Sequence, residues 1–205
     1  SLPVKKGEKY YLALDNVHPK GEGHTLEIYY LKEITVIGTV LDESKKPVAA
    51  ATVWVENMNG KIIDATQCDS EGRYWLSAKI KDDEYYSLLY TSDSSFIECR
   101  QILLNEFAKT SYIQKDLKTT LPKLERGKKY ILDGISYNTK TGRLHAASYP
   151  TLNALARLMM KYKDLKVQIE GHVNNPLVAA NTGADKILGQ NRATEVYDYL
   201  LNKGI

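Results

Sequence analysis

The stretch Ile169-Glu170-Gly171-His172-Val173-Asn174, followed by Asp185-x-x-Leu188-Gly189-x-x-Arg192-Ala193-x-x-Val196-x-x-x-Leu200, decides the fold of the second half of this chain. Just before and within it, Leu165, Val167 and Ile169 alternate with polar residues, which predicts a half-buried strand. The apolar residues after it recur at helical spacing, which predicts a helix from about residue 190.

These residues resemble the signature of OmpA-like peptidoglycan-binding domains, over about residues 127–205. In that family a strand ends in Gly-His-Thr-Asp, and a helix opens with Asn-x-x-Leu-Ser-x-x-Arg-Ala. The Asp and the Arg together hold the diaminopimelate of the peptidoglycan stem peptide. The resemblance implies that Arg192, in the first turn of its helix, binds the ligand's carboxylate, because a guanidinium offers a forked set of donors and a helix N-terminus favours an anion.

The position of the family's Asp is occupied by Asn174, which carries no charge. Loss of one ion pair to the ligand's ammonium weakens binding by about 1 to 3 kcal/mol. Asp185, at the position of the family's Asn, is a new carboxylate nearby. We hypothesise that Asp185 supplies the missing charge across the pocket from Arg192.

Further residues depart from the family pattern. Tyr137-Asn138 stands where the family has Phe-Asp, and Gly189 replaces the Ser that opens the second helix, which makes a weaker cap. The loop 173–187 is more apolar than usual, with Leu177 and Val178. The candidate ligand-binding residues are therefore Arg192, Asn174, Asp185 and Asn138. His172 is expected to be a packed, hydrogen-bonded histidine rather than a metal ligand.

The segment before this signature predicts the other elements of an α/β layer. Lys129-Tyr-Ile-Leu132 is expected to form a strand. Ser148 is expected to cap a helix that has Pro150 in its first turn. Its apolar face is predicted to hold Leu152, Leu155, Ala156, Met159 and Tyr162. Strand, helix, strand and helix in this order predict helices packed on one face of a sheet.

Residues 33–118 predict a small antiparallel sandwich, since short strands alternate with turns every 8 to 12 residues. Val36-Ile-Gly-Thr-Val40, Pro47 and Asp69-Ser-Glu-Gly-Arg-Tyr74 resemble the noncatalytic carboxypeptidase regulatory-like domain family. Asp69 is expected to bond to its own turn, with Gly72 at positive φ. Trp54 and Trp75 are predicted to be core or half-core aromatics.

The remaining segments complete the domain organisation. Residues 1–32 predict strands of a preceding or truncated β module, and the charged stretch 119–126 is expected to be a linker. Cys68 and Cys99 match no zinc or redox motif; a disulfide and two buried free thiols are both open. The chain starts with Ser1 and ends after a helical pattern, so we expect a fragment of a longer protein.

Composition excludes several classes of function. No stretch is apolar enough for a membrane span or a signal peptide. Residues 121–205 hold 13 Lys and Arg against 7 Asp and Glu, a balance far below that of a nucleic-acid binder. No nucleophile elbow, zinc helix or phosphate loop occurs, so neither an enzyme nor a cofactor or metal site is expected.

A regulatory-like sandwich followed by an OmpA-like domain resembles the organisation of PorE-like periplasmic proteins of Bacteroidetes, including components of the type IX secretion system. The resemblance implies a noncatalytic anchor in the periplasm that binds peptidoglycan and ties an outer-membrane complex to the wall. The alternative is a degenerate OmpA-like fold that serves as a structural or protein-interaction module in an envelope complex. A charged cleft around Arg192 would favour the first, and a cleft filled by Leu177 and Val178 the second.

Overall fold

The structure is a computed structural model that describes residues 31–81, 85–102, 111–138, 142–173 and 183–205, with only the backbone for 111–116 and 184. Residues 1–30 form a unit of their own and lie outside the described residues, so the expected β module at 1–32 is not described. Leu31 to Ile205 belong to a single compact unit.

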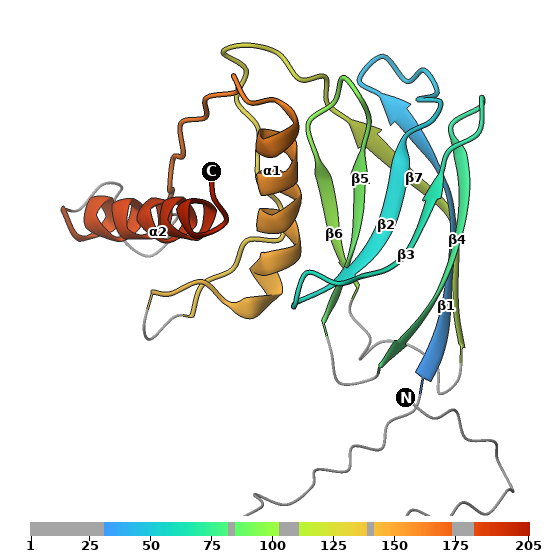
Figure 1. Ribbon diagram of the computed structural model, residues 1–205, viewed down its shortest axis with the longest axis horizontal. Helices are drawn as coiled ribbons and strands as arrows, with labels where there is room; N and C mark the ends of the chain where they lie inside the picture. Colours follow the sequence, from blue (N-terminus) through green and yellow to red (C-terminus); the bar gives the residue numbers. More distant parts are fainter. Residues whose placement is uncertain (1–30, 82–84, 103–110, 139–141, 174–182) are drawn as a thin grey trace, which may run out of the picture. The chain divides into compact units, whose positions relative to one another are not determined.

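Seven strands form two sheets in the first part of this unit (Figure 1). The three-stranded sheet has the order β4-β1-β7, and the four-stranded sheet has the order β3-β2-β5-β6. Strand β1 is antiparallel to β4 and parallel to β7, whereas all pairs of the second sheet are antiparallel. The strands are β1 Leu31–Asp42, β2 Thr52–Asn57, β3 Ile62–Gln67, β4 Arg73–Lys81, β5 Tyr86–Thr91, β6 Glu98–Ile102 and β7 Ser111–Leu121. We call these strands the two-sheet part.

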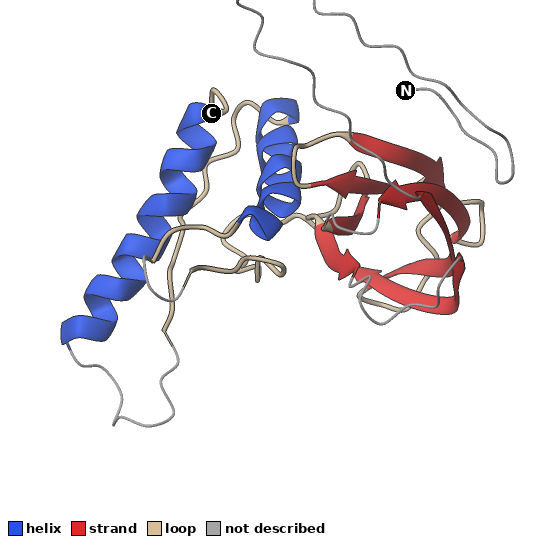
Figure 2. Ribbon diagram, turned by 90° about the horizontal axis from the view of Figure 1, so that it is seen from below, coloured by secondary structure: helices blue, strands red, loops and turns tan. Residues whose placement is uncertain are grey.

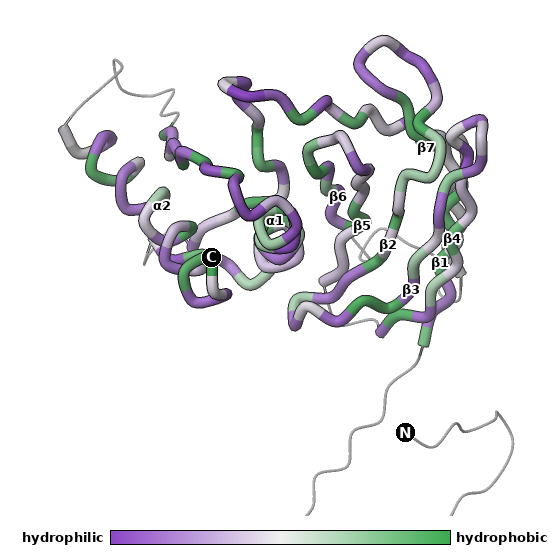
Figure 3. Tube along the Cα trace, turned by 45° about the horizontal axis from the view of Figure 1, so that its top comes forward, coloured by the Kyte–Doolittle hydropathy of each residue, from purple (hydrophilic) through white to green (hydrophobic). Residues whose placement is uncertain are grey.

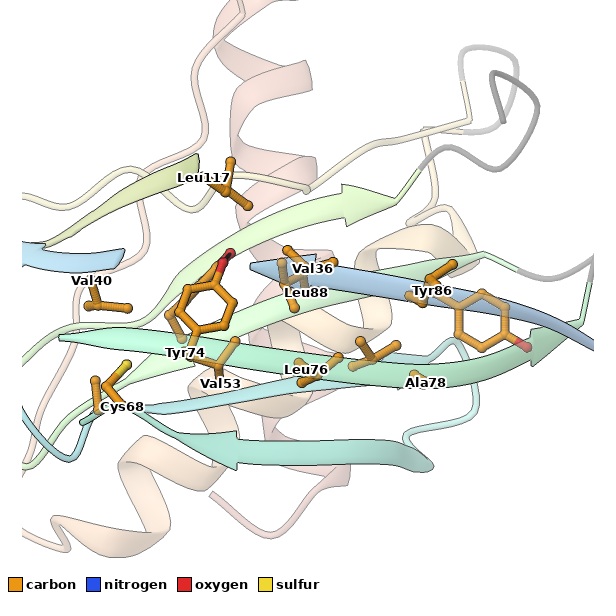
Figure 4. Packing of buried hydrophobic residues seen from close by; sticks show 14 of the residues in the cluster. Val36, Val40, Val53, Cys68, Tyr74, Leu76, Ala78, Tyr86, Leu88 and Leu117 are labelled. Atoms are coloured by element: carbon orange, nitrogen blue, oxygen red, sulfur yellow. Dashed lines mark hydrogen bonds between the residues drawn. The ribbon is translucent and has the colours of Figure 1, made fainter. Parts of the chain in front are cut away.

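A first hydrophobic cluster lies between the two sheets. Strand β4 shows why: Tyr74, Leu76, Ala78 and Ile80 are buried and alternate with residues that point to solvent. Figure 4 shows side chains of this cluster packed against one another. The same alternation places Trp75 on the outer face, where it is 68% exposed, so the prediction that Trp75 is a core or half-core aromatic is wrong.

The two central strands of the four-stranded sheet, β2 and β5, are buried on both faces. Along β2, Val53 and Val55 face the first cluster, whereas Trp54 belongs to a second cluster on the outer face. Cross-strand pairing aligns Trp54 with Leu89 and Leu89 with Cys99, and all three lie in this second cluster. Central strands that are covered on both faces have buried residues at nearly every position, and this is the pattern of β2 and β5.

The turn before β4 follows its expected chemistry. Asp69 Oδ1 accepts hydrogen bonds from the backbone N–H groups of Glu71 and Arg73, each at 2.9 Å. Gly72 has φ of +71°, and a Cβ there would lie 2.4 Å from the Val40 carbonyl oxygen. Both predictions for this turn are confirmed, because a short carboxylate and a glycine determine the turn locally.

The segment expected to be a linker lies against the two-sheet part. Its first three residues belong to β7, which ends at Leu121. Phe96 N donates to Pro122 O, and Leu124 N donates to Ser94 O, both at 2.8 Å. These bonds attach the chain after β7 to the loop between β5 and β6.

Residues 122–205 form the helical part, which contains α1 Tyr149–Lys161, α2 Gly183–Asn202 and the short 3-10 helix η2 Ala146–Ser148. Helix α1 starts after Ser148 with Pro150 in its first turn, as predicted, but the Ser148 hydroxyl donates to Ser136 O instead of capping the helix. The predicted apolar face is confirmed, with Leu152, Leu155 and Ala156 buried.

Helix α1 covers the outer face of the four-stranded sheet, and α2 packs on α1 (Figures 1 and 2). In the described part of the chain, no helix has the length and apolar character needed to cross a bilayer. Figure 3 shows hydrophilic and hydrophobic residues mixed along both helices.

The strands expected within residues 129–132 and 165–170 are absent, since the described residues after Leu121 contain no strand. Leu165 and Ile169 still pack against the second cluster. Alternation of apolar and polar residues gives a segment the one apolar face that a half-buried strand needs, but a strand also needs a hydrogen-bonded neighbour. Helix α2 starts at Gly183 rather than near residue 190, so the predicted start is wrong and Arg192 lies within the helix.

The two cysteines are free and buried. Cys68 belongs to the cluster between the sheets and Cys99 to the cluster on the outer face, where Thr151 Oγ1 donates to Cys99 Sγ at 2.9 Å. Of the two possibilities left open by the sequence, the structure contains the pair of free thiols, because the four-stranded sheet separates them.

We predict that both thiols react slowly in the folded protein. Burial, helped by Asp69, raises the pKa of Cys68 to about 11, and burial raises the pKa of Cys99. At pH 8 a thiol of pKa near 11 is ionised in about one molecule in a thousand, against about one in four for an ordinary cysteine. Labelling with a chromogenic disulfide reagent should therefore be slow in buffer and fast in denaturant; rapid labelling of folded protein contradicts this.

The raised pKa of Cys68 also predicts a loss of stability at high pH. The unfolded thiol ionises from about pH 8.5, whereas the folded one ionises only near 11. The stability that this difference in pKa gives the folded protein is thus present below pH 8.5 and is lost as the pH rises towards 11. Denaturant unfolding of the parent and of Cys68→Ala between pH 8 and 11 should show a steeper decline for the parent.

Candidate functional site

A contact between two glycines brings the OmpA-like signature together in space. The extended segment 168–173 passes directly against α2 at Gly171 and Gly189. A Cβ built on Gly171 would lie 2.1 Å from the Gly189 carbonyl oxygen, and one built on Gly189 would lie 2.5 Å from the Gly171 carbonyl oxygen. Only glycines allow two backbones to approach this closely. Gly189 is therefore a packing residue inside α2 and not the helix cap expected from the sequence.

A cavity of about 450 Å³ lies between this segment and α2. Its charged and ionisable lining residues are Glu170 and His172 from the segment, and Asp185 and Lys186 from the first turns of α2. The cavity therefore presents carboxylates and cationic or protonatable groups together. A site of this kind suits a zwitterionic or mixed-charge ligand.

Glu170 is held in its ionised form. Lys129 Nζ lies 3.0 Å from its Oε2, and this hydrogen bond, with the charge of Lys129, lowers the pKa of Glu170. His172 Nε2 lies 3.6 Å from the same oxygen and lowers that pKa further. The His172 side chain is 83% exposed, so the prediction of a packed histidine is wrong.

Arg192 lies against the wall of the cavity but does not line it. Its Nη1 donates to the His172 carbonyl oxygen at 3.4 Å, and its guanidinium lies 5.1 Å from the centre of the Tyr137 ring. Its Nε is buried and has no hydrogen-bond partner among the residues that the structure describes. Because α2 begins at Gly183, Arg192 is beyond the first turn, and the first turn instead contains the acidic residue Asp185.

A clasp formed by residues 136–138 and 142–145 connects Asn138 with Arg192. Tyr137 and Leu144 form an isolated antiparallel bridge, and Asn138 N donates to Arg143 O at 2.8 Å. The Tyr137 hydroxyl donates to the Arg192 carbonyl oxygen at 3.0 Å. The clasp thus holds Tyr137 under Arg192 and leaves Asn138 exposed beside it. Burial raises the pKa of Tyr137, although Arg192 opposes this, so the hydroxyl remains a donor.

The structure therefore brings together only some of the predicted site residues. Asp185 lines the cavity, and Arg192 lies seven residues later on the same helix, about 10.5 Å along its axis. Asp185 is thus not across a pocket from Arg192 but on the same helix. Asn174 lies outside the described residues, as do Leu177 and Val178 of the loop.

Sequence reasoning missed three contributors to the site: Lys186, Glu170 and the ring of Tyr137. Lys186 and Glu170 lie beside signature residues, and their charge was the available signal. The role of Tyr137 depends on a contact 55 residues away and had no signal in the sequence. No group of three His, Cys, Asp or Glu able to hold a metal occurs within the described residues.

The comparison with protein families decides the nature of this segment. Residues 137–205 match the OmpA family. The matched residues thus contain Tyr137, both helices and the cavity, and they lie within the segment 127–205 expected from the sequence. The match covers the C-terminal third of the chain and does not extend to the strands. No curated protein matches the chain.

Three solved structures resemble part of the chain. The 3-chlorocatechol 1,2-dioxygenase of Rhodococcus opacus 1CP is 11% identical, and the match covers 47% of this chain and 61% of that chain with a TM-score of 0.34. The catechol 1,2-dioxygenase of Acinetobacter radioresistens is 10% identical, and the match covers 47% of this chain and 53% of that chain with a TM-score of 0.35. The TIE protein of Bacillus anthracis is 16% identical, and the match covers 45% of this chain and 18% of that chain with a TM-score of 0.35. The chain spans less than two thirds of the length of each. With TM-scores this low, these likenesses support no conclusion about activity.

We predict that Gly189→Ala destabilises the OmpA-like segment. In an open helix the change would stabilise by about 1 kcal/mol, since alanine favours helix. Here the added methyl meets the Gly171 carbonyl, and overpacking costs about 1 to 3 kcal/mol, so the net effect should be a loss. Denaturant unfolding measures it. Gly183→Ala is the control, because a Cβ there meets no described atom within 4 Å; equal effects of both changes would contradict the prediction.

Proposed function

We propose that this protein is a noncatalytic binding module of the cell envelope whose OmpA-like segment binds the diaminopimelate-containing stem peptide of peptidoglycan. The observation that carries the proposal is the mixed-charge cavity of the segment that matches the OmpA family. In this reading the two-sheet part is a regulatory-like sandwich. The protein lies in the periplasm and ties an outer-membrane assembly to the wall.

The charges around the cavity fit the two ends of a diaminopimelate side chain. Its ammonium group pairs with a carboxylate, and the cavity lining contains Asp185 from α2 and Glu170 from the extended segment. Its carboxylate pairs with a cation, for which Lys186 lines the cavity and Arg192 lies against its wall. This arrangement offers a carboxylate from α2 in place of the charge absent at Asn174.

Arg192 is the proposed partner of the ligand carboxylate. Its bond to the His172 carbonyl oxygen, at 3.4 Å, is longer than the usual 2.7 to 3.2 Å. A carboxylate is a stronger acceptor than a carbonyl for a guanidinium, so a ligand can replace this bond with a better one. The ring of Tyr137, which lies under the guanidinium, keeps the side chain at that wall.

Calorimetric titration with a diaminopimelate-containing stem-peptide fragment tests this function. We expect Arg192→Ala to weaken binding about tenfold to a hundredfold, because a hydrogen bond to a charged group contributes about 1.5 to 3 kcal/mol. Arg126→Ala, which removes an exposed arginine outside the cavity, is the matched control and should bind as the parent does. Equal affinities of Arg192→Ala and the parent would remove Arg192 from the site.

Asp185→Asn tests the second charge in the same titration. The change keeps the size of the side chain and removes its charge, so binding should weaken if Asp185 pairs with the ligand ammonium. A fragment with lysine in place of diaminopimelate lacks one carboxylate and should lose most of its dependence on Arg192. Unchanged binding by Asp185→Asn would assign the ammonium to Glu170 instead.

The alternative is an OmpA-like fold that serves as a structural or protein-interaction module in an envelope complex. The observation in its favour is the outer surface of α2, where Ile187, Tyr197 and Leu201 are each more than half exposed. Exposed apolar residues along one helix are typical of contact surfaces. A parent protein that is folded by circular dichroism and gives no heat with the stem peptide would favour this alternative.

A further inference from the structure

A fully buried carboxylate lies where the two-sheet part meets the helical part. Glu56, near the end of β2, is 0% exposed and projects from the outer face of the four-stranded sheet. Its Oε2 accepts a hydrogen bond from Trp54 Nε1 at 3.0 Å, and its Oε1 accepts one from Asn153 Nδ2 at 3.0 Å. Arg157 Nη2 donates to Oε2 as the partner of an ion pair. Both oxygens are therefore satisfied.

Two of these three partners come from α1, about a hundred residues further along the chain. The guanidinium of Arg157 also lies 5.4 Å from the centre of the Trp54 ring, as a cation over an aromatic face. Arg157 thus covers the carboxylate and the indole of β2 at the same time. The sheet provides the acceptor and the ring, and the helix provides the charge.

The contacts continue from α1 to α2. The Tyr199 hydroxyl of α2 donates to Asn153 Oδ1 at 2.8 Å, and the Tyr199 ring stacks on that of Tyr149 at 5.1 Å. Burial, with Tyr149 and Glu56 nearby, raises the pKa of Tyr199 to about 12, so the hydroxyl stays a donor at neutral pH. Asn153 therefore donates to the sheet and accepts from the second helix.

Burial makes these contacts interdependent. A carboxylate removed from water requires a counter-charge and hydrogen bonds, and loss of one partner is far more costly than loss of an exposed ion pair. Separation of α1 from the sheet would leave the Trp54 indole as the only hydrogen-bond partner of the Glu56 carboxylate among the described residues. The packing of α1 and the burial of Glu56 are thus one event.

We propose that Glu56 is a positioning residue that docks α1, and through Asn153 and Tyr199 also α2, on the two-sheet part. The strands and the OmpA-like segment are then one cooperative unit, and the strands hold in place the helix that lines the cavity. This inference rests on the proposed function only for the identity of the ligand of α2. Its test therefore contains no ligand.

Trp54 reports on this junction directly. The chain has two tryptophans, Trp54 and Trp75, of which Trp54 is 6% exposed and Trp75 is 68% exposed. In a Trp75→Phe background, the emission wavelength and acrylamide quenching of Trp54 follow the docking of α1. Hydrogen exchange measured by mass spectrometry follows α2 separately.

We expect Glu56→Gln in this background to increase quenching of Trp54 and to lower the protection of α2 amides at least tenfold, while the strands stay protected. Glu43→Gln is the matched control: Glu43 forms an exposed ion pair of 2.7 Å with Lys128, also between the strands and the helical part. The control should change neither readout. Since Glu56→Gln affects a buried site, Arg157→Ala provides a second variant if the first does not fold.

The background protein should unfold in one transition in denaturant, with Trp54 emission and far-ultraviolet circular dichroism changing together. Two results would overturn the proposal. One is that Trp54 becomes exposed at a lower denaturant concentration than the one at which the strands unfold. The other is that Trp54 quenching and α2 hydrogen exchange stay unchanged in both Glu56→Gln and Arg157→Ala. Absence of stem-peptide binding would contradict the proposed function alone and leave this result standing.

Discussion

The buried carboxylate of Glu56 is the constraint on which the arrangement of this protein depends. It turns the outer face of the four-stranded sheet into a surface that accepts only a helix with an amide and a guanidinium at the right places, and α1 presents Asn153 and Arg157 there. Trp54, Leu89 and Cys99 provide the apolar area beside it. Apolar burial gives most of the attraction, whereas the charged group determines where the helix sits, because a misplaced helix leaves the carboxylate unpaired.

The candidate site depends on a second constraint, which is the close approach of two backbone segments. Gly171 and Gly189 let an extended segment touch the backbone of α2, and the cavity opens beside that contact. The charged residues then come from two elements that local sequence alone would not place face to face. The clasp adds Tyr137 from a third direction and fixes Arg192. The placement of the charged groups around the cavity therefore depends on a contact between two uncharged backbones.

The parts of the fold that follow from local rules agree with the sequence analysis. The Asp69 turn, the start of α1 and its apolar face depend on neighbours within a few residues. The family signature also identified the segment that matches the OmpA family. The errors fall where distant residues decide. Trp75 is a large aromatic of the kind found in cores, but its position along β4 points it to the outer face. Residues 165–170 alternate like a strand, but the described residues contain no strand that pairs with them.

The sequence by itself determined the periodicities, the turns and the OmpA-like signature, because each is written in residues that lie close together along the chain. Only the tertiary structure decided that Trp54 is covered and Trp75 is not, that Glu56 is buried, and that Gly189 is a contact and not a cap. The position of Asp185 in the cavity, with Arg192 at its wall, was decided in the same way. The physical reason is that burial and charge pairing depend on which surfaces meet, and residues nearly a hundred positions apart determine that.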